Sequence, residues 1–510
     1  MALGESKTFV GANERFLILL FSLVAALRVF IFSAAFPFFS NVDEDLHYDL
    51  ITQYSHAQFP RSFDRLKEET LNWIVPYASP EFLFPAEHFP DGKFPAPLWK
   101  EPWSKVEPEI ASTRAAWSGE INFQSSQPPL YYASAAGWWS IGKHIGLGGL
   151  QSLYWIRLLN VLLVAMMVWL GYLTARMVAP TGIDVRIGVP LLLAFIPQNV
   201  FYAMNNDVLS PLCFGALFLC TLQWLRTNAP GLLLGALTGL AVAAACLTKM
   251  SNLPLVAVVL AVIVARSIAI ILRTPRAGLI AFTALISCSA IPVGIWMLWT
   301  KLHFGDLTGS TVKIGLLGWT RKPFGDWWQH PIFTLHGVWT FWSDLIASFW
   351  RGEVSWHGHT LRWCGADGFY AISSLLLLSA AIAGLRKHAG LSVFQRQAIG
   401  IAILIFLAGV AFLALLSIQF DFGNCINPSP QHPYFTSGRL LSGALIPFAL
   451  SYVYGLSCLC RLVTSRFCQT RGIGTALSLV VLVAIVLFSQ VSEIVITHPV
   501  FASEHNWFHR

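Results

Sequence analysis

Apolar segments of membrane-spanning length recur along the chain, and they constrain its fold more than any other feature. A run of about 20 apolar residues is long enough to cross the hydrocarbon core as a helix. Of the 510 residues, 55% are hydrophobic and 12% are charged, about half the charged share of a typical soluble domain. The sequence therefore predicts an all-α polytopic membrane protein. We place about eleven spanning helices near residues 16–38, 152–176, 187–204, 207–226, 231–249, 252–272, 277–300, 368–386, 397–418, 434–460 and 474–496.

The charges in the connecting segments predict the orientation of these helices. Lys and Arg dominate alternate connections, whereas the first loop, 39–127, holds fourteen acids and seven Lys or Arg. Because cytoplasmic loops are enriched in Lys and Arg, we expect a cytoplasmic N-terminus and an extracytoplasmic C-terminus. In a bacterium the membrane would be the inner one. The net charge of +7 belongs to these loops, so we expect no nucleic-acid partner.

The chain is expected to form one transmembrane domain, 1–510, with two large extracytoplasmic loops, 39–127 and 301–367. Nine prolines restrict helices to the first part of the first loop. There the spacing of apolar residues over 43–58 predicts an amphipathic helix on the membrane surface. Eight tryptophans in the second loop favour the headgroup layer, so this loop should lie on the bilayer.

The sequence holds neither a nucleotide-binding loop nor a soluble cytoplasmic domain, which argues against chemistry with ATP or a sugar nucleotide. Nine cysteines show no spacing of a zinc site. Cys364 and Cys425 fall in outer segments, where a disulfide and two free thiols are both open alternatives.

An acidic cluster follows the first spanning segment, within Asn41–Asp49. Asp43 and His47 are four residues apart and would share one face of a helix. A carboxylate near lipid has its pKa raised by desolvation, so Asp43, with Glu44 beside it, could act as a base. Carboxylates also hold Mg²⁺ or Mn²⁺, with Asp43 as the candidate ligand. An acid-rich helix start is the alternative.

Three cations at the predicted outer surface run against the usual charge bias: Lys249, Arg351 and Arg439. A lipid-linked phosphate would hold them there, whereas snorkelling to bilayer phosphates is the alternative. Arg28 and Arg157 lie within predicted spans, where they either serve function or form structural pairs.

Two polar motifs accompany these charges. Gln127 precedes Pro128 and Pro129, which should start a helix that carries Tyr131 and Tyr132. Asn206 and Asp207 follow Asn205 at the outer end of the fourth span. We predict that these motifs line a substrate pocket, although a re-entry turn and an N-cap explain them equally well.

The order of these motifs resembles the GT-C superfamily of membrane glycosyltransferases. The likeness is greatest to the protein O-mannosyltransferase and aminoarabinose-transferase group and to related predicted membrane proteins of unknown function. It continues to the C-terminal part of the chain, with one departure at Leu440, where relatives often have an aromatic residue. The motifs are Arg28, Asp43-Glu44-x-x-His47, Gln127-Pro128-Pro129-Leu130-Tyr131-Tyr132, Arg157-Leu158-Leu159-Asn160, Asn205-Asn206-Asp207, Leu247-Thr248-Lys249 and Ser437-Gly438-Arg439-Leu440.

The resemblance implies a GT-C-like bundle that transfers a hexose or pentose from a polyprenyl-phosphate carrier. The acceptor would be a hydroxyl of a glycan, lipid or protein at the outer face. The transfer would be a single displacement with inversion at the anomeric carbon, and membrane lipids would surround the protein. Asp43 would be the base or the metal ligand, with Glu44 and His47 beside it. Lys249, Arg439 and Arg351 would bind the phosphate. A lipid-sugar flippase or transporter and a non-catalytic glycolipid-binding protein are the competing hypotheses.

Overall fold

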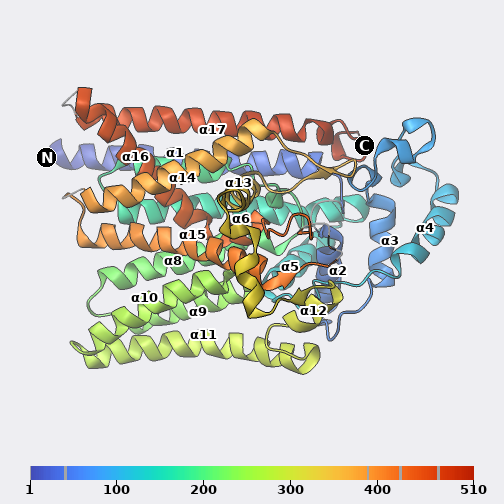
Figure 1. The fold of residues 1–510 in the computed structure, drawn as a ribbon, viewed down its shortest axis with the longest axis horizontal. Coiled ribbons are helices and arrows are strands. Elements are labelled where there is room, and N and C mark those ends of the chain that lie inside the picture. The colour runs from blue at the N-terminus through green and yellow to red at the C-terminus, as the bar shows by residue number, and fades with distance from the viewer. Residues whose placement is uncertain are drawn as a thin grey trace.

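The computed structural model describes residues 2–39, 43–387, 390–423, 425, 428–467 and 471–509. Asn41 and Val42, which open the predicted acidic stretch, lie outside the described residues. Long helices run side by side along the long axis of the molecule (Figure 1). They are α1 (Ala2–Ala35), α6 (Gly149–Val178), α7 (Ile183–Phe195), α8 (Ser210–Arg226), α9 (Leu232–Thr248), α10 (Leu253–Ile271), α11 (Pro275–Phe304), α14 (Cys364–Lys387), α15 (Val393–Gln419), α16 (Leu445–Phe467) and α17 (Arg471–Phe501).

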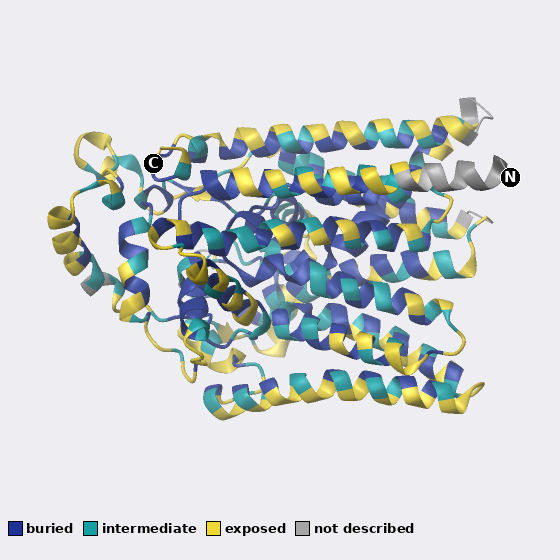
Figure 2. Cartoon of the chain, turned by 180° about the vertical axis from the view of Figure 1, so that it is seen from behind, coloured by how far each residue is buried: buried dark blue, intermediate teal, exposed yellow. Residues whose placement is uncertain are grey.

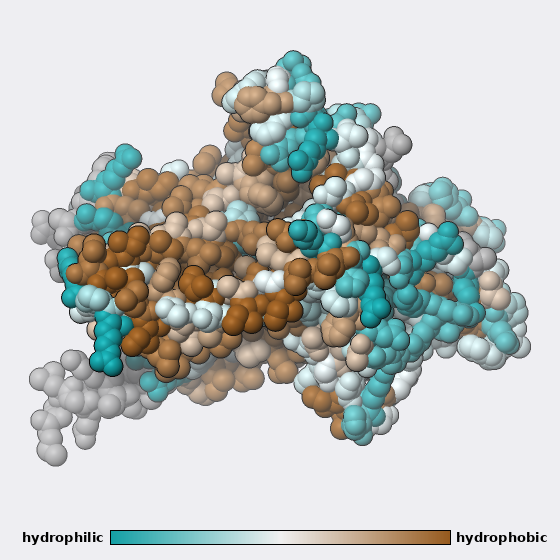
Figure 3. Space-filling model, turned by 90° about the horizontal axis from the view of Figure 1, so that it is seen from below, coloured by the Kyte–Doolittle hydropathy of each residue, from teal (hydrophilic) through white to brown (hydrophobic). Residues whose placement is uncertain are grey.

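Every predicted span overlaps one of these helices, which confirms the all-α membrane fold. In the described part of the chain, nine helices are long and apolar enough to cross a membrane. The other two are shorter, because α9 has 17 residues and α7 ends at Phe195 instead of continuing to residue 204. On the face shown in Figure 3, hydrophobic side chains cover much of the bundle, and hydrophilic ones are most extensive at the right end, with smaller patches at the left end.

Shorter elements in residues 43–148 and 305–363 form a lobe, which has residues 68–117 at the more hydrophilic end and extends back to residues 335–351 near the middle of the molecule (Figure 1). Two short antiparallel pairs of strands and several 3-10 turns accompany its helices. The helices are α2 (Glu44–Ser55), α3 (Glu68–Tyr77), α4 (Trp103–Trp117), α5 (Leu130–His144), α12 (Ser310–Leu316) and α13 (Leu335–Arg351), and the paired strands are β1 (Thr320–Arg321) with β4 (Phe420–Asp421) and β2 (Ser355–Trp356) with β3 (His359–Thr360).

Two expectations about the first loop are wrong. Its prolines do not prevent helices, because α4 contains Pro108 and α3 contains Pro76 near its end. Each proline removes one backbone hydrogen bond without ending the helix. The helix at 44–55 is not a surface helix either, since nine of its twelve residues are buried. Its polar Asp49 accepts hydrogen bonds from Thr70 and Asn122, so the protein surrounds α2 on several sides.

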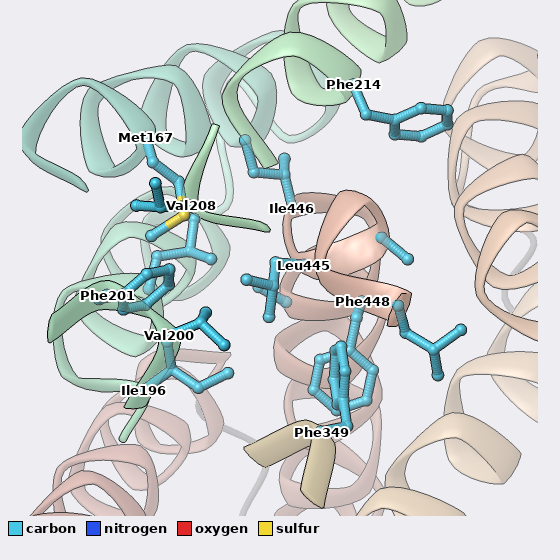
Figure 4. Packing of buried hydrophobic residues seen from close by; sticks show 14 of the residues in the cluster. Met167, Ile196, Val200, Phe201, Val208, Phe214, Phe349, Leu445, Ile446 and Phe448 are labelled. Carbon is cyan, nitrogen blue, oxygen red and sulfur yellow. The ribbon is translucent and has the colours of Figure 1, made fainter. Parts of the chain in front are cut away.

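α16 occupies the centre of the bundle, because 94% of its most apolar window is buried inside the protein. The outer helices instead expose one side along their length (Figure 2). Leu445, Ile446 and Phe448 of α16 pack near Phe201 and Phe349 (Figure 4). This core joins the bundle to the segments that carry the polar site.

Two glycines bring α9 and α11 into backbone contact at the edge of the bundle. A Cβ added at Gly235 would lie 2.0 Å from the carbonyl oxygen of Ala281, and one at Gly239 would lie 2.4 Å from that of Leu285. Glycines four residues apart allow two membrane helices to approach closely. The 17-residue α9 is therefore held by packing against a longer neighbour.

The segment after α7 leaves the helix inside the protein, at Ile196-Pro197. Its carbonyl groups need other donors, because unsatisfied backbone groups are costly away from water. Gln490 donates to the carbonyl of Phe195 at 2.7 Å, and Asn160 donates to that of Ala203 at 2.7 Å. Side chains from α17 and α6 thus stabilise the irregular stretch, which leads directly to Asn206 and Asp207.

Arg28 also supports this stretch, and its partner is Glu493 of α17, a residue that sequence reasoning missed. Arg28 Nη1 lies 2.8 Å from Glu493 Oε2, and Nη2 donates to the carbonyl of Ile196 at 2.8 Å. The Tyr202 hydroxyl contacts both charged groups. The structural alternative for Arg28 therefore holds: it joins α1, α17 and the chain after α7.

Arg28→Met should lower the free energy of unfolding by about 3–5 kcal/mol, because Glu493 remains buried without its partner. The double variant Arg28→Met/Glu493→Leu should recover most of this loss. Thermal unfolding of the detergent-solubilised protein measures both. Val491→Ala, at an exposed position of α17, is the control. An unchanged free energy of unfolding in Arg28→Met would contradict the structural role of Arg28.

Candidate functional site

A fully buried ion pair between Arg157 and Glu44 fixes the floor of the site. Arg157 donates to Glu44 at 2.7 and 2.5 Å, and both side chains are inaccessible to solvent. Arg157 also donates to the carbonyls of Ser33, Phe36 and Pro37 at the end of α1. The pair therefore binds the end of α1 to the start of α2.

Glu44 has no free position for a substrate proton. Besides Arg157, its carboxylate accepts from the backbone N–H of Phe39 at 3.0 Å and of Met204 at 2.9 Å. The structure therefore separates Glu44 from its neighbour Asp43: Glu44 holds the fold together, and we do not retain it as a helper in catalysis.

Asp43 points to the opposite side of the α2 start, toward Arg439. It precedes α2 with a left-handed backbone, φ 63°, and its carbonyl accepts from the His47 N–H at 3.0 Å. Its Oδ2 lies 3.0 Å from Arg439 Nη2 and 3.2 Å from Gln124 Nε2. The Asp43 side chain remains 35% exposed, so a ligand can reach it.

Another ion pair lies beside the pair of Asp43 and Arg439. Lys249, which lies between α9 and α10, pairs with Asp207, and both are buried. Arg439 bridges the two pairs, because its Nη1 lies 3.9 Å from Asp207 Oδ2. The structure thus brings together Asp43, Asp207, Lys249 and Arg439 from four distant parts of the sequence. We call these four residues the charged cluster.

Neutral side chains connect the charged cluster to the other predicted pocket residues. Asn206 donates to Gln127 at 3.1 Å, and Gln127 donates to Gln124 at 2.9 Å. Asn205 caps the turn by accepting from the Asp207 N–H, as the N-cap alternative predicts. The network ends at Asp43 through Gln124, so a contact at Asn206 is linked to the acid.

The two tyrosines of α5 have different places. The Tyr132 hydroxyl is hydrogen-bonded to His47 Nδ1 at 2.8 Å, with the two rings stacked, and Tyr131 contacts Tyr132 edge-on; both tyrosines are fully buried. Burial, helped by the charges of Arg439 and Lys249, lowers the pKa of His47 to about 3. His47 is therefore neutral at physiological pH and does not serve as a cation.

The electrostatics of Asp43 reverse the sequence expectation of a raised pKa. Burial raises the pKa of Asp43, but the charge and hydrogen bond of Arg439, together with the charges of His47 and Lys313, hold the pKa below its ordinary value. Asp45, which sequence reasoning did not select, behaves in the opposite way. Burial and the charge of Asp43 raise the pKa of Asp45 to about 7. The sequence shows only three consecutive acids, Asp43, Glu44 and Asp45, and contains no pattern that predicts their different pKa shifts.

Two further charged residues approach the cluster, and sequence reasoning missed both. Lys313 of α12 places Nζ 3.4 Å from Gln124 Oε1. Glu353 accepts from Ser437, whose hydroxyl also accepts from Arg439 Nε at 3.3 Å. Burial raises the pKa of Glu353. Neither residue lies in a recognisable motif, because the tertiary fold alone brings its segment to the site.

The remaining candidates lie elsewhere. Arg351 pairs with Asp367 at 2.7 Å, which leaves it outside the charged cluster. Cys364 and Cys425 are free thiols, so the disulfide alternative is not formed. Cys425 instead accepts a hydrogen bond from Trp319 Nε1 at 2.9 Å and donates one to the Leu317 carbonyl at 3.3 Å.

The donor set around Asp43 does not suit a divalent cation. Within the described residues, no three His, Cys, Asp or Glu side chains gather in a way that could hold a metal ion. The Asp43 oxygen that faces the site already contacts Arg439, and Lys313 adds a second positive charge nearby. A divalent ion there would be repelled by both.

Residues 27–423 match a family model that is described as a predicted membrane protein, DUF2142. The chain belongs to this family. The match confirms the likeness to predicted membrane proteins that the motifs indicated, and it includes Asp43, Lys249 and Lys313 but ends before Arg439. No curated protein matches the chain.

The similar solved structures include two of archaeal oligosaccharyltransferases and one of ArnT. The oligosaccharyltransferase of Archaeoglobus fulgidus in the apo form is 10% identical with a TM-score of 0.39, and the match covers 95% of this chain and 56% of that one. AglB from the same organism, in complex with an inhibitory peptide and a dolichol-phosphate, is 13% identical with a TM-score of 0.39, covering 98% and 56%. The DUF2142 chain thus spans little more than half the length of these archaeal proteins.

The third similar structure is ArnT from Cupriavidus metallidurans bound to undecaprenyl phosphate. It is 12% identical with a TM-score of 0.40, and the match covers 95% of this chain and 73% of that one.

Glu44→Gln should lower the free energy of unfolding by about 3–5 kcal/mol, because Arg157 would keep a buried charge without a partner. Asp43→Asn should change it by less than about 1 kcal/mol, since the side chains of Asp43 and Arg439 are both partly exposed to solvent. Thermal unfolding of the two purified variants compares them directly. An equal loss of unfolding free energy in the two variants would contradict the separate roles of Glu44 and Asp43.

Proposed function

We propose that this chain transfers a sugar from a polyprenyl-phosphate donor to an acceptor hydroxyl at the extracytoplasmic face of the membrane. In this proposal the lobe faces the extracytoplasmic side, and the connections at the other end of the bundle face the cytoplasm. The charge bias of the sequence supports that orientation, because Lys and Arg dominate the connections opposite the lobe.

The observation that carries the proposal is the charged cluster: an accessible acid held against two cations where the bundle meets the lobe. Asp43 lies 3.0 Å from Arg439, which lies 3.9 Å from Asp207, the partner of Lys249. Transfer from a lipid phosphate needs cations to stabilise the departing phosphate and a base to accept the proton of the hydroxyl. Both kinds of group are present in one small volume.

Donor binding and base activation are coupled in this arrangement. The donor phosphate would take up hydrogen bonds from Arg439 and Lys249, which now face carboxylates. Because the charge of Arg439 holds the pKa of Asp43 low, a phosphate that neutralises this charge raises the pKa of Asp43. Asp43 then becomes a stronger base when the donor is present, and it accepts the acceptor proton as the hydroxyl oxygen attacks the anomeric carbon.

The departing group leaves as the lipid phosphate, with its new negative charge beside Arg439 and Lys249. His47, neutral and hydrogen-bonded to Tyr132, forms part of the wall near Asp43. Gln127 and Asn206 supply amide groups for hydroxyls of the sugar or acceptor. A single displacement requires no covalent intermediate with the protein.

Asp43→Asn should lower the rate of sugar transfer at least about 100-fold, because the proton acceptor is lost. The variant should still bind polyprenyl phosphate. Mass spectrometry of the product and of the bound lipid, after reconstitution of the full chain, measures the two properties separately. Lys93→Met, at an exposed lobe position, is the control and should transfer normally.

Asp45→Asn tests the choice between neighbouring acids, since the pKa of Asp45 is about 7. Loss of transfer in Asp45→Asn with normal transfer in Asp43→Asn would assign the base to Asp45. Normal transfer in both variants would contradict acid–base catalysis by either acid, whereas absence of transfer in the wild type would favour a lipid-sugar transporter.

Chelation should leave transfer unchanged within about twofold, because Arg439 and Lys249 supply the positive charge that a metal ion would otherwise provide. The measurement is the initial rate with EDTA and after addition of Mg²⁺ or Mn²⁺. A rate that falls at least tenfold with EDTA and returns with either metal would overturn this assignment.

A further inference from the structure

Lys313 differs from the other two cations of the site in its partners. Lys249 is paired with Asp207, and Arg439 is paired with Asp43. Within the described residues, no carboxylate oxygen lies within 4.0 Å of Lys313 Nζ. Its nearest partner is the neutral amide oxygen of Gln124, at 3.4 Å.

The segment that carries Lys313 is built to hold it in this place. Asp306 accepts from the backbone N–H groups of Thr308 and Thr311 at 2.7 and 2.8 Å, which fixes the turn before α12. Gly309 has φ 66°, and an added Cβ there would lie 2.5 Å from Cβ of Ser126. After α12, β1 pairs with β4 and ties the segment to the end of α15.

The charges of the charged cluster, Lys313 and Glu353 together leave room for about one negative charge. The pairs Asp43–Arg439 and Asp207–Lys249 each cancel, and Lys313 adds one positive charge. Glu353 makes the total zero when it is ionised and +1 when it is protonated. A ligand with a single negative charge stays within one charge of neutrality in both states, whereas two negative charges do not. Uncompensated charge is costly beside the buried Asp207 and Lys249.

We propose that Lys313 is a third phosphate-binding residue of the donor site and restricts this site to donors that carry a single phosphate. This inference rests on the proposed function, because it assumes that the charged cluster receives a lipid-linked phosphate. A sugar joined through one phosphodiester carries one negative charge, and a sugar joined through a diphosphate carries two. Lys313 binds the phosphate oxygen that faces α12, while Arg439 and Lys249 bind the others.

The test uses two sugar-free probes that differ by one phosphate group and therefore by one negative charge: a polyprenyl methyl phosphate diester and the corresponding methyl diphosphate diester. Binding to the full-length protein in nanodiscs, in the presence of EDTA, is measured by quenching of intrinsic tryptophan fluorescence. The wild type should bind the monophosphate at least about tenfold more tightly. Lys313→Met should weaken this binding about 10- to 100-fold, as expected for one charge-assisted hydrogen bond.

Lys313→Arg should stay within about threefold of the wild type, because it keeps the charge. This variant also separates loss of charge from misfolding, and Lys93→Met controls for loss of an exposed lysine. Equal or tighter binding of the diphosphate by the wild type would overturn the charge limit. Unchanged monophosphate binding in Lys313→Met would overturn the role of Lys313.

Failure of the proposed function gives a different result. Binding that depends on Lys313, without transfer from any lipid-phosphate sugar, would leave this inference in place and contradict catalysis. Transfer that persists in Lys313→Met at the wild-type rate and affinity would leave the function in place and contradict this inference.

Discussion

The ion pair between Arg157 and Glu44 is the interaction on which the site depends. It joins α6, the end of α1, the start of α2 and the backbone at Met204, all without contact with solvent. A buried pair of this kind is costly to break from one side, because the remaining charge stays in a low-dielectric interior. Its position also sets the direction of the neighbouring residue. With Glu44 directed inward to Arg157, Asp43 is directed toward Arg439.

The charged cluster is nearly neutral, and this explains both its stability and its suitability for an anionic ligand. Arg439 and Lys249 are each held in place by a carboxylate, so these two cations are positioned before the ligand arrives. A phosphate that replaces these carboxylate contacts also changes the basicity of Asp43. Binding of the donor and readiness for proton transfer are thereby linked through one guanidinium group, that of Arg439.

Sequence reasoning located most of the members of the site but not their roles. Asp43, Lys249, Arg439 and Asn206 are found together, since each lies at or near a span end that the hydropathy and charge patterns identify, and Gln127 joins them from the motif that ends the first loop. Glu44 and Arg351 have the same residue types in similar positions, yet both are committed to structural pairs. Lys313, Glu353 and Glu493 were missed because the sequence around them contains no motif. The sign of the Asp43 pKa shift was wrong because it depends on Arg439, 396 residues away.

The sequence by itself determined the membrane fold, the places of the spanning helices and the collection of polar motifs at their ends. These follow from hydrophobic length and from charge bias, which are local properties of the chain. Only the tertiary structure decided which acid faces which cation. That choice depends on distances of a few ångströms between α2, the turn after α7, the connection before α10, α12 and the segment before α16. The attraction between two charges weakens as their distance grows. The pairing of acids with cations, rather than composition, therefore sets which groups can bind a phosphate and which only hold the fold together.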